Sequence, residues 1–135
     1  MSHFSEFHIK MNDEKSLIAA LESMGFQGKV EVHQTAQPLY GYQGDVRAQK
    51  AHIIIRKRHV GSASNDIGFE RMADGTYRVW ISDYDKSKYN QKWIDSLITK
   101  YTGARILDKV NKLRKYQVSV KQEGSDMEII LKSWS

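Results

Sequence analysis

The stretch Ala51-His52-Ile53-Ile54-Ile55-Arg56-Lys57-Arg58-His59 is the strongest strand signal in this chain of 135 residues. Three successive β-branched residues favour a strand. Because they fill both of its faces, we expect a central rather than an edge position for residues 51–58. The strand ends in three cations, and side-chain alternation would put Arg56 and Arg58 on one face and Lys57 on the other. Arg56 and Arg58 are therefore the first candidates for ligand contact.

The elements before this strand follow from periodicity and capping. Alternating apolar residues over 6–11 predict a half-buried strand. A helix is expected to begin at Asn12-Asp13-Glu14 and to stop at Gly25. A second strand is expected at 29–33. Residues 34–50 contain the only proline and show no sustained period, so we predict a long surface loop, with or without a short edge strand in it.

The elements after it are two hairpins around a helical segment. Strands at 66–72 and 76–82 are joined by a tight turn, and Arg78 and Trp80 share the face opposite the apolar residues of the second strand. Apolar residues at helical spacing over 91–113 predict one helix, or two joined at Thr102-Gly103. Alternation predicts a last pair of strands between Tyr116 and Leu131.

The predicted order is β-α-β-β-β-β-α-β-β in a single domain, residues 1–135. Short gaps between the strands favour an antiparallel sheet of the α+β class. We expect the two helical segments to pack on one face of this sheet. The opposite face would remain open to solvent or to a ligand.

Composition narrows the class of protein. Hydrophobic residues make up 40% and charged residues 27%, which is ordinary for a globular protein. The absence of cysteine excludes disulfides and thiolate metal sites. No apolar run approaches the roughly 20 residues of a membrane span, and the first residues lack the pattern of a signal peptide. We expect a cytoplasmic protein without a membrane partner.

The positive charge is segregated along the chain. The net charge is +5, and residues 86–121 hold ten cations and two acids, which gives +8 there and leaves −3 for the rest. Segregation of this kind indicates a face that binds an anionic partner.

Two groups of residues are candidate nucleic-acid contacts, because single-stranded RNA needs cations for phosphates and flat side chains for unpaired bases. The first group is Arg47, Lys50, Arg56, Lys57, Arg58, Arg78 and Trp80. The second is Arg105, Lys109, Lys112, Arg114 and Lys115. The alternatives are that Trp80 packs under a loop, that the cations are solvated, and that the second group complements a helix dipole. The Gly41-Tyr42-Gln43-Gly44 stretch is a turn with a packing tyrosine or a base-stacking loop.

Catalytic chemistry has little support in the sequence. The five histidines lack metal-ligand spacing. Asp66, Asp83 and Asp85 could together hold Mg²⁺ for a nuclease, but aspartates just before a helix usually cap it. No nucleophile, base and oxyanion donor can be assembled. We expect a non-enzymatic protein without cofactor or metal.

Several short strings resemble one family in the same order along the chain. They are Met1-Ser2-His3-Phe4-Ser5, Gly41-Tyr42-Gln43-Gly44, Asp66-Ile67-Gly68-Phe69, the segment 100–107 and Lys132-Ser133-Trp134-Ser135. The family is domain of unknown function 1257, the hypothetical chloroplast reading frame 35 proteins of plastids and cyanobacteria, which have no established activity. Similar small proteins occur in nucleus-forming jumbo phages, and the basic C-terminal half resembles their RNA-binding chimallin C group.

Together these observations predict an RNA-binding protein that contacts single-stranded RNA, such as phage mRNA, with low sequence specificity. The resemblance to the phage group would place it in the cytoplasm of a host cell, at or near the phage nucleus. The alternative is an adaptor whose basic face docks an acidic protein or a phage shell, with or without self-association. Whether the two basic groups share one face is left open by the sequence.

Overall fold

The computed structural model describes residues 3–113, 116–123 and 126–133, with side chains up to Leu113. Its long elements alternate as predicted, β-α-β-β-β-β-α-β-β, and three short helical turns are added. The order along the chain is β1 (Phe4–Ile9), α1 (Glu14–Leu21), η1 (Glu22–Phe26), β2 (Val30–Tyr40), β3 (Val46–Ile55), α2 (Lys57–Val60), β4 (Ile67–Arg71), β5 (Tyr77–Ser82), η2 (Asp85–Ser87), α3 (Gln91–Leu113), β6 (Tyr116–Glu123) and β7 (Asp126–Ser133).

The centre of the fold is a five-stranded antiparallel sheet in the order β1-β5-β4-β3-β2. The isoleucine-rich strand is β3, which has neighbours on both sides, so its predicted internal position is confirmed. Ile53, Ile54 and Ile55 are fully buried. Three successive isoleucines fit at this end of β3 because both faces of the strand are covered there.

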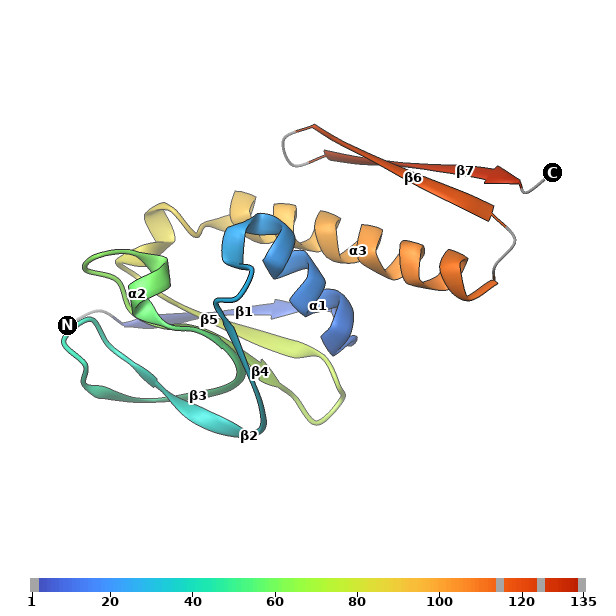
Figure 1. The fold of residues 1–135 in the computed structure, drawn as a ribbon. Coiled ribbons are helices and arrows are strands. Elements are labelled where there is room, and N and C mark those ends of the chain that lie inside the picture. The colour runs from blue at the N-terminus through green and yellow to red at the C-terminus, as the bar shows by residue number, and fades with distance from the viewer. Residues whose placement is uncertain (1–2, 114–115, 124–125, 134–135) are drawn as a thin grey trace.

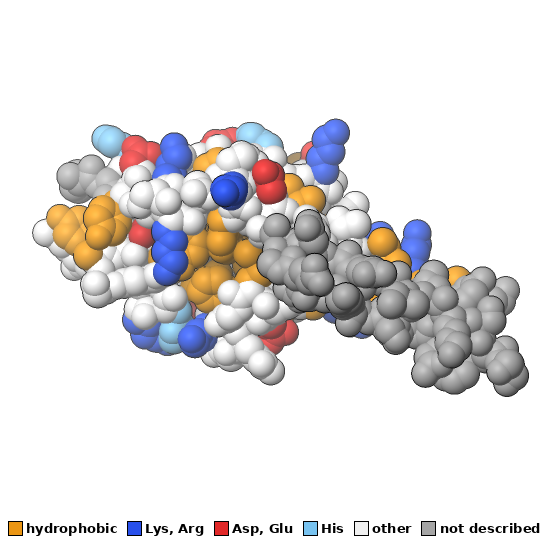
Figure 2. Space-filling view, turned by 90° about the horizontal axis from the view of Figure 1, so that it is seen from above, with side chains coloured by type: hydrophobic (Ala, Val, Ile, Leu, Met, Phe, Trp, Pro, Cys, Tyr) orange, Lys and Arg blue, Asp and Glu red, His pale blue; other side chains and the backbone are white. Residues whose placement is uncertain are grey.

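The helices α1 and α3 pack on one face of the sheet, as predicted (Figure 1). Tyr77, Val79 and Ile81 of β5 point into this layer and form one core with Leu17 of α1 and Leu97 of α3. The phenol oxygen of Tyr101 accepts hydrogen bonds from the backbone N–H groups of Asn12 and Asp13, at 3.1 and 3.0 Å. Figure 2 shows the molecule from this helical side.

Local groups cap the helices, and the cap at Asp13 confirms the predicted start of α1. Asp13 Oδ2 accepts from the Ser16 N–H at 3.0 Å at the start of α1. Gly25 has φ +103°, a left-handed conformation that glycine adopts without strain and that ends the helix. The side chain of Asn90 accepts from the Trp93 N–H at 3.1 Å at the start of α3. Of the two forms predicted for 91–113, the single helix is found.

Two predictions about the middle of the chain were wrong. Residues 34–50 are not a loop: they continue β2 and begin β3, and only the tip between Tyr40 and Val46 is a turn. Strand β3 ends at Ile55 rather than at residue 58, and Lys57–Val60 forms the short helix α2. The strand signal of 34–50 was weak because its pairing is interrupted by register shifts after Val32 and after Pro38.

The face opposite the helices is only partly open, which corrects the expectation for it. Leu39 of β2 and Ala51 of β3 are fully buried there with Ile54, and Phe4 and Trp80 pack against them. The end of the β2–β3 hairpin is held to the segment before β4, because the Asp66 N–H donates to the Tyr40 carbonyl at 3.0 Å. This end of the hairpin therefore covers one part of the sheet.

Strands β6 and β7 follow α3 in the chain and form a separate antiparallel pair that runs back beside the C-terminal part of this helix (Figure 1). The predicted last hairpin is thus confirmed. Among the described residues, no helix is long and apolar enough to cross a bilayer.

Candidate functional site

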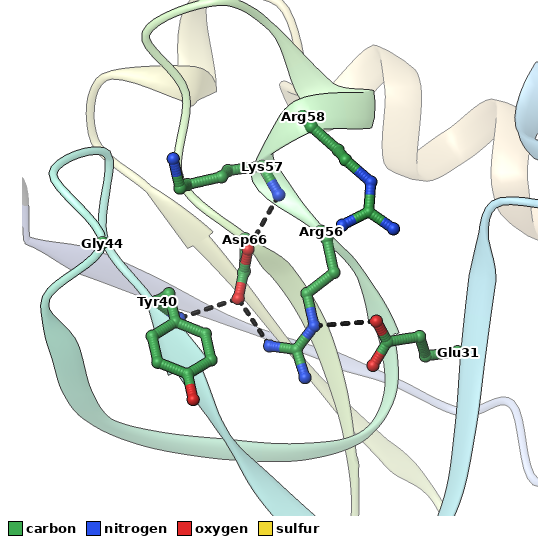
Figure 3. A pocket seen from close by; sticks show the side chains of 7 residues that line it. All are labelled: Glu31, Tyr40, Gly44, Arg56, Lys57, Arg58 and Asp66. Atoms are coloured by element: carbon green, nitrogen blue, oxygen red, sulfur yellow. Dashed lines mark hydrogen bonds and ion pairs between the residues drawn. The ribbon is translucent and has the colours of Figure 1, made fainter.

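A hollow of about 400 Å³ opens where β3 passes into α2. Its lining residues, drawn in Figure 3, are Glu31, Tyr40, Gly44, Arg56, Lys57, Arg58 and Asp66. They come from the β2–β3 hairpin, from α2 and from the segment before β4. Three cations of the first predicted group are therefore brought together with a tyrosine and two carboxylates.

Asp66 holds this site together. Its side chain is fully buried, and its carboxylate accepts three hydrogen bonds. Oδ1 accepts from the Lys57 N–H at 2.7 Å, and Oδ2 accepts from the Tyr40 N–H at 2.7 Å and from Nη1 of Arg56 at 2.8 Å. One side chain thus fixes the start of α2 and the tip of the hairpin relative to each other.

Arg56 is a structural residue rather than the free cation that we expected. Its guanidinium lies between Asp66 and Glu31, with Nε 3.0 Å from Glu31 Oε2, and donates to the Pro38 carbonyl at 3.2 Å. It also covers the Tyr40 ring, 5.2 Å from its centroid, and its side chain is 17% exposed. The hydrogen bond from Arg56 holds the pKa of Glu31 below its ordinary value. The choice of Arg56 as a first ligand contact finds no support in this geometry.

Lys57 and Arg58 present their charge differently from the prediction. Because the strand ends at Ile55, the two residues lie in a helical turn and do not alternate across a sheet. The turn is closed by the Gly61 N–H, which donates to the Lys57 carbonyl at 3.1 Å. Their side chains diverge from α2 above the Arg56–Asp66 pair (Figure 3), and within the described residues neither forms an ion pair with an acid.

Arg78 and Trp80 lie on the face opposite the helices, as predicted, but they are engaged with acids. The Arg78 guanidinium stacks on the indole at 4.9 Å from the ring centroid. Glu70 Oε1 accepts from Nη2 of Arg78 at 2.9 Å and from the indole N–H of Trp80 at 3.1 Å, and Glu6 lies 3.5 Å from Arg78. Acid and base alternate across the strands here, so this face is a mixed-charge network rather than a cationic platform.

The remaining cations of the first group lie apart from the hollow. Arg47 pairs with Asp45 at 3.3 Å and lies over the Phe4 ring. Lys50 is exposed on β3.

The second basic group is at the far end of α3. Arg105 lies 3.7 Å from Asp13 and Lys112 lies 3.0 Å from Asp108, whereas Lys109 is exposed. Arg114 and Lys115 lie outside the described residues. The first turn of α3 is near α2, and 16 residues of helix from Trp93 to Lys109 span about 24 Å. Among the described residues, the cations of the second group therefore lie far from Lys57 and Arg58 along the molecule.

Sequence reasoning missed Tyr40 and Glu31 as site residues. Tyr40 was assigned to a loop, and Glu31 to an isolated short strand. Asp66 was considered only as a metal ligand or as the first residue of a strand. The signal that could have identified Asp66 is its position directly before a buried strand, because an acid there can accept hydrogen bonds from a neighbouring backbone turn.

The aspartates considered for a metal-dependent nuclease have other partners in the structure. Among the described residues, no three His, Asp or Glu side chains gather in a way that could hold a metal ion. Asp85 is buried and accepts from Ser82 Oγ at 2.6 Å and from the Asn65 N–H at 3.0 Å. The two buried aspartates of the nuclease alternative, Asp66 and Asp85, therefore have structural partners.

Comparison with known proteins gives a family and no function. No curated protein matches the chain, and no solved structure matches it. The model of the family described as protein of unknown function, DUF1257, matches residues 20–131. This range runs from within α1 into β7 and contains the whole hollow. The chain therefore belongs to the DUF1257 family.

Proposed function

We propose that this protein binds single-stranded RNA without catalysis and with low sequence preference, and that α2 with the adjoining hollow is the contact site. The observation that carries the proposal is the pair Lys57 and Arg58, two adjacent cations on an anchored turn without acidic partners within the described residues. The hollow holds three cations and two carboxylates, so its lining has a net charge of +1. Both carboxylates are already bonded to Arg56.

The chemistry of the two side chains suits a nucleic-acid backbone. Arg58 can contact a phosphate with two N–H groups, and Lys57 adds a point charge beside it. Tyr40 lines the hollow and offers a flat side chain for an unpaired base. None of these groups reads a base edge in a fixed geometry, which is why low sequence preference is expected.

The resemblance to the RNA-binding proteins of jumbo phages supports the same class of ligand, and phage mRNA in the host cytoplasm would then be the natural RNA. The arrangement of charge moves the proposed contact away from the Arg78–Trp80 face. There, Arg78 is neutralised by Glu6 and Glu70.

Fluorescence anisotropy with an RNA of about 20 nucleotides tests the proposal, because this length exceeds the footprint of a single small domain. Lys57→Gln/Arg58→Gln should weaken binding about 100-fold or more at low salt, since each substitution removes a charged hydrogen bond to the RNA, worth about 1.5 kcal/mol or more. It should also make the slope of log affinity against log salt shallower by about 1.4, or about 0.7 for each phosphate that is no longer neutralised.

The matched control is Lys10→Gln/Lys15→Gln, which removes the same charge from exposed positions beyond β1 and in α1. Its affinity should stay within about twofold of the wild type, because distant exposed charges are screened. A third variant, Arg105→Gln/Lys109→Gln/Lys112→Gln, measures the second basic group. Equal losses of affinity in the site variant and in the control, or no binding at low salt, would overturn the proposed site.

The competing class is an adaptor that docks an acidic protein or a phage shell. The free charges of Lys57 and Arg58 would serve such a partner equally well. Co-purified nucleic acid, seen as a high ratio of absorbance at 260 nm to that at 280 nm, favours RNA binding. A protein that purifies free of nucleic acid and does not shift the anisotropy of the RNA favours the adaptor.

A further inference from the structure

A second hollow lies on the helical face and contains a buried lysine. Lys100 of α3 is only 4% exposed, and its Nζ has no hydrogen-bond partner among the residues whose side chains the structure describes. It lies on the same side of the helix as Trp93 and Ser96, seven and four residues earlier. Lys100 is one of the ten cations counted in residues 86–121, and its burial is a finding of the tertiary structure.

This second hollow has a volume of about 570 Å³. From the helical side, hydrophobic side chains are visible in a hollow bordered by lysine and arginine side chains (Figure 2). The lining residues come from η1, α2, the segment before α3 and α3 itself. They are Ser23, Met24, Phe26, His59, Val60, Lys88, Tyr89, Trp93, Ser96 and Lys100.

The polar groups of this hollow are suited to an anion. Among the described residues that line it there is no carboxylate, whereas Lys88 and Lys100 supply two ammonium groups and His59 a ring nitrogen. A buried amine without a partner is unfavourable, because it has lost water and gained no acceptor in exchange. An anionic ligand would supply the missing acceptor, and the flexible stem of Lys100 lets the amine turn toward it.

The walls of the hollow are apolar and aromatic. Tyr89 and Trp93 meet edge to face with ring centroids 5.1 Å apart, and Phe26 packs beside Tyr89 at 6.5 Å. Tyr89 is fixed by its hydroxyl, which donates to the Val60 carbonyl at 3.3 Å. Rigid rings next to two ammonium groups suit a ligand that is charged at one end and planar at the other.

We propose that this hollow binds a phosphate monoester of an aromatic compound, of the size of a nucleoside monophosphate. A phosphate monoester carries a charge of about −1.5 to −2 near neutral pH, which matches two lysines better than a monocarboxylate does. The volume lies within the range of about 300–1,000 Å³ that is usual for small-molecule sites. Lys100 binds the phosphate, Lys88 approaches it from the rim, and the rings hold the base.

Isothermal titration calorimetry with adenosine 5′-monophosphate, adenosine and inorganic phosphate tests this on the full chain. The monophosphate should bind more tightly than either fragment, since only it contacts both the lysines and the rings. Lys100→Met keeps the side-chain length and removes the amine, so the affinity for the monophosphate should fall about 10- to 100-fold. No detectable binding to the wild type, or equal affinity in Lys100→Met, would overturn the proposal.

Two further measurements distinguish a loss of ligand binding from a loss of folding. Without ligand, Lys100→Met should unfold at the same temperature as the wild type or higher, because an unpartnered buried amine is replaced by an apolar side chain. If Lys100→Met does not fold, Lys88→Gln, a substitution at an exposed position, serves in its place. It should lower the affinity for the monophosphate about 3- to 10-fold. An unchanged affinity in that variant would also overturn the proposal.

The proposal is independent of RNA binding. Lys57→Gln/Arg58→Gln should bind the monophosphate as the wild type does, and Lys100→Met should retain its affinity for RNA. The two proposed sites can therefore be tested separately, and either proposal can be wrong while the other is right.

Discussion

Replacing Asp66 with Asn should destabilise the protein strongly although the two side chains have nearly the same shape. The buried carboxylate accepts from two backbone N–H groups, of Tyr40 and Lys57, and from Arg56. An Asn side chain has an oxygen at only one of the two positions that Oδ1 and Oδ2 occupy in Asp66. Its NH₂ group takes the other position and must face at least one N–H donor. The variant thus loses a bond and leaves a buried donor without an acceptor.

The size of the effect follows from these hydrogen bonds. Losing one hydrogen bond to a charged acceptor costs about 1.5–3 kcal/mol. Arg56 also loses its buried counter-ion and keeps only Glu31, whose side chain is 37% exposed. Removing one partner of a buried ion pair costs about 3–5 kcal/mol in total. We therefore expect Asp66→Asn to lower the free energy of unfolding by about 3–4 kcal/mol. This value lies above the cost of one lost hydrogen bond and in the lower part of the range for a broken buried ion pair.

Urea unfolding followed by circular dichroism measures this difference. With a slope of about 2 kcal/mol per molar urea, the midpoint should fall by about 1.5–2 M. The control is Glu22→Gln, an exposed residue at the end of α1 whose substitution should cost less than about 0.5 kcal/mol. In a double-mutant cycle with Arg56→Met, the two destabilisations should fall short of additivity by more than about 1 kcal/mol. A destabilisation by Asp66→Asn no larger than that of the control would refute the anchoring role.

Two further predictions test the sheet and its charge. A Cβ on Gly68 would lie 2.6 Å from the Ala51 Cβ and 2.8 Å from Leu39 Cδ2. Gly68→Ala should therefore lower the free energy of unfolding, measured in urea, by about 1–3 kcal/mol. The double variant Gly68→Ala/Ala51→Gly should recover part of this loss, and a Gly68→Ala variant as stable as the wild type would contradict the close packing. The pKa of Glu31 is lowered from its ordinary value of 4.5 by its hydrogen bond from Arg56. The stabilisation is therefore fully present above pH 4.5 and is lost as the pH falls through the lowered pKa. Glu31→Gln should cost up to about 1 kcal/mol at pH 7, and in urea unfolding its difference from the wild type should shrink as the pH is lowered below 4.5; a difference that does not depend on pH argues against the ion pair.

The order of elements could be predicted because it depends on local patterns. Alternation in β5 placed Tyr77, Val79 and Ile81 toward the helices and Arg78 and Trp80 on the other face, and the burial of these residues agrees. Caps at Asp13 and Asn90 act within three residues. Signals of this range are readable from sequence, since the interacting groups are neighbours along the chain.

The candidate site could be predicted only in composition. Arg56, Lys57 and Arg58 were singled out as cations, but their roles depend on partners far away in the sequence. Glu31 lies 25 residues from Arg56, and Asp66 lies 10 residues from it. Which cation is neutralised and which remains free is decided when the β2–β3 hairpin meets the segment before β4.

The sequence by itself therefore determined the α+β class, the order of the elements, the helical face and the presence of excess positive charge. The tertiary structure decided where that charge can act. It bound Arg56 and Arg78 to acids, left Lys57 and Arg58 free of acidic partners among the described residues, and buried Lys100 in a hollow lined with aromatic rings. The reason is physical: periodicity is a property of neighbouring residues, whereas neutralisation and burial of a charge depend on segments that meet only in the folded chain.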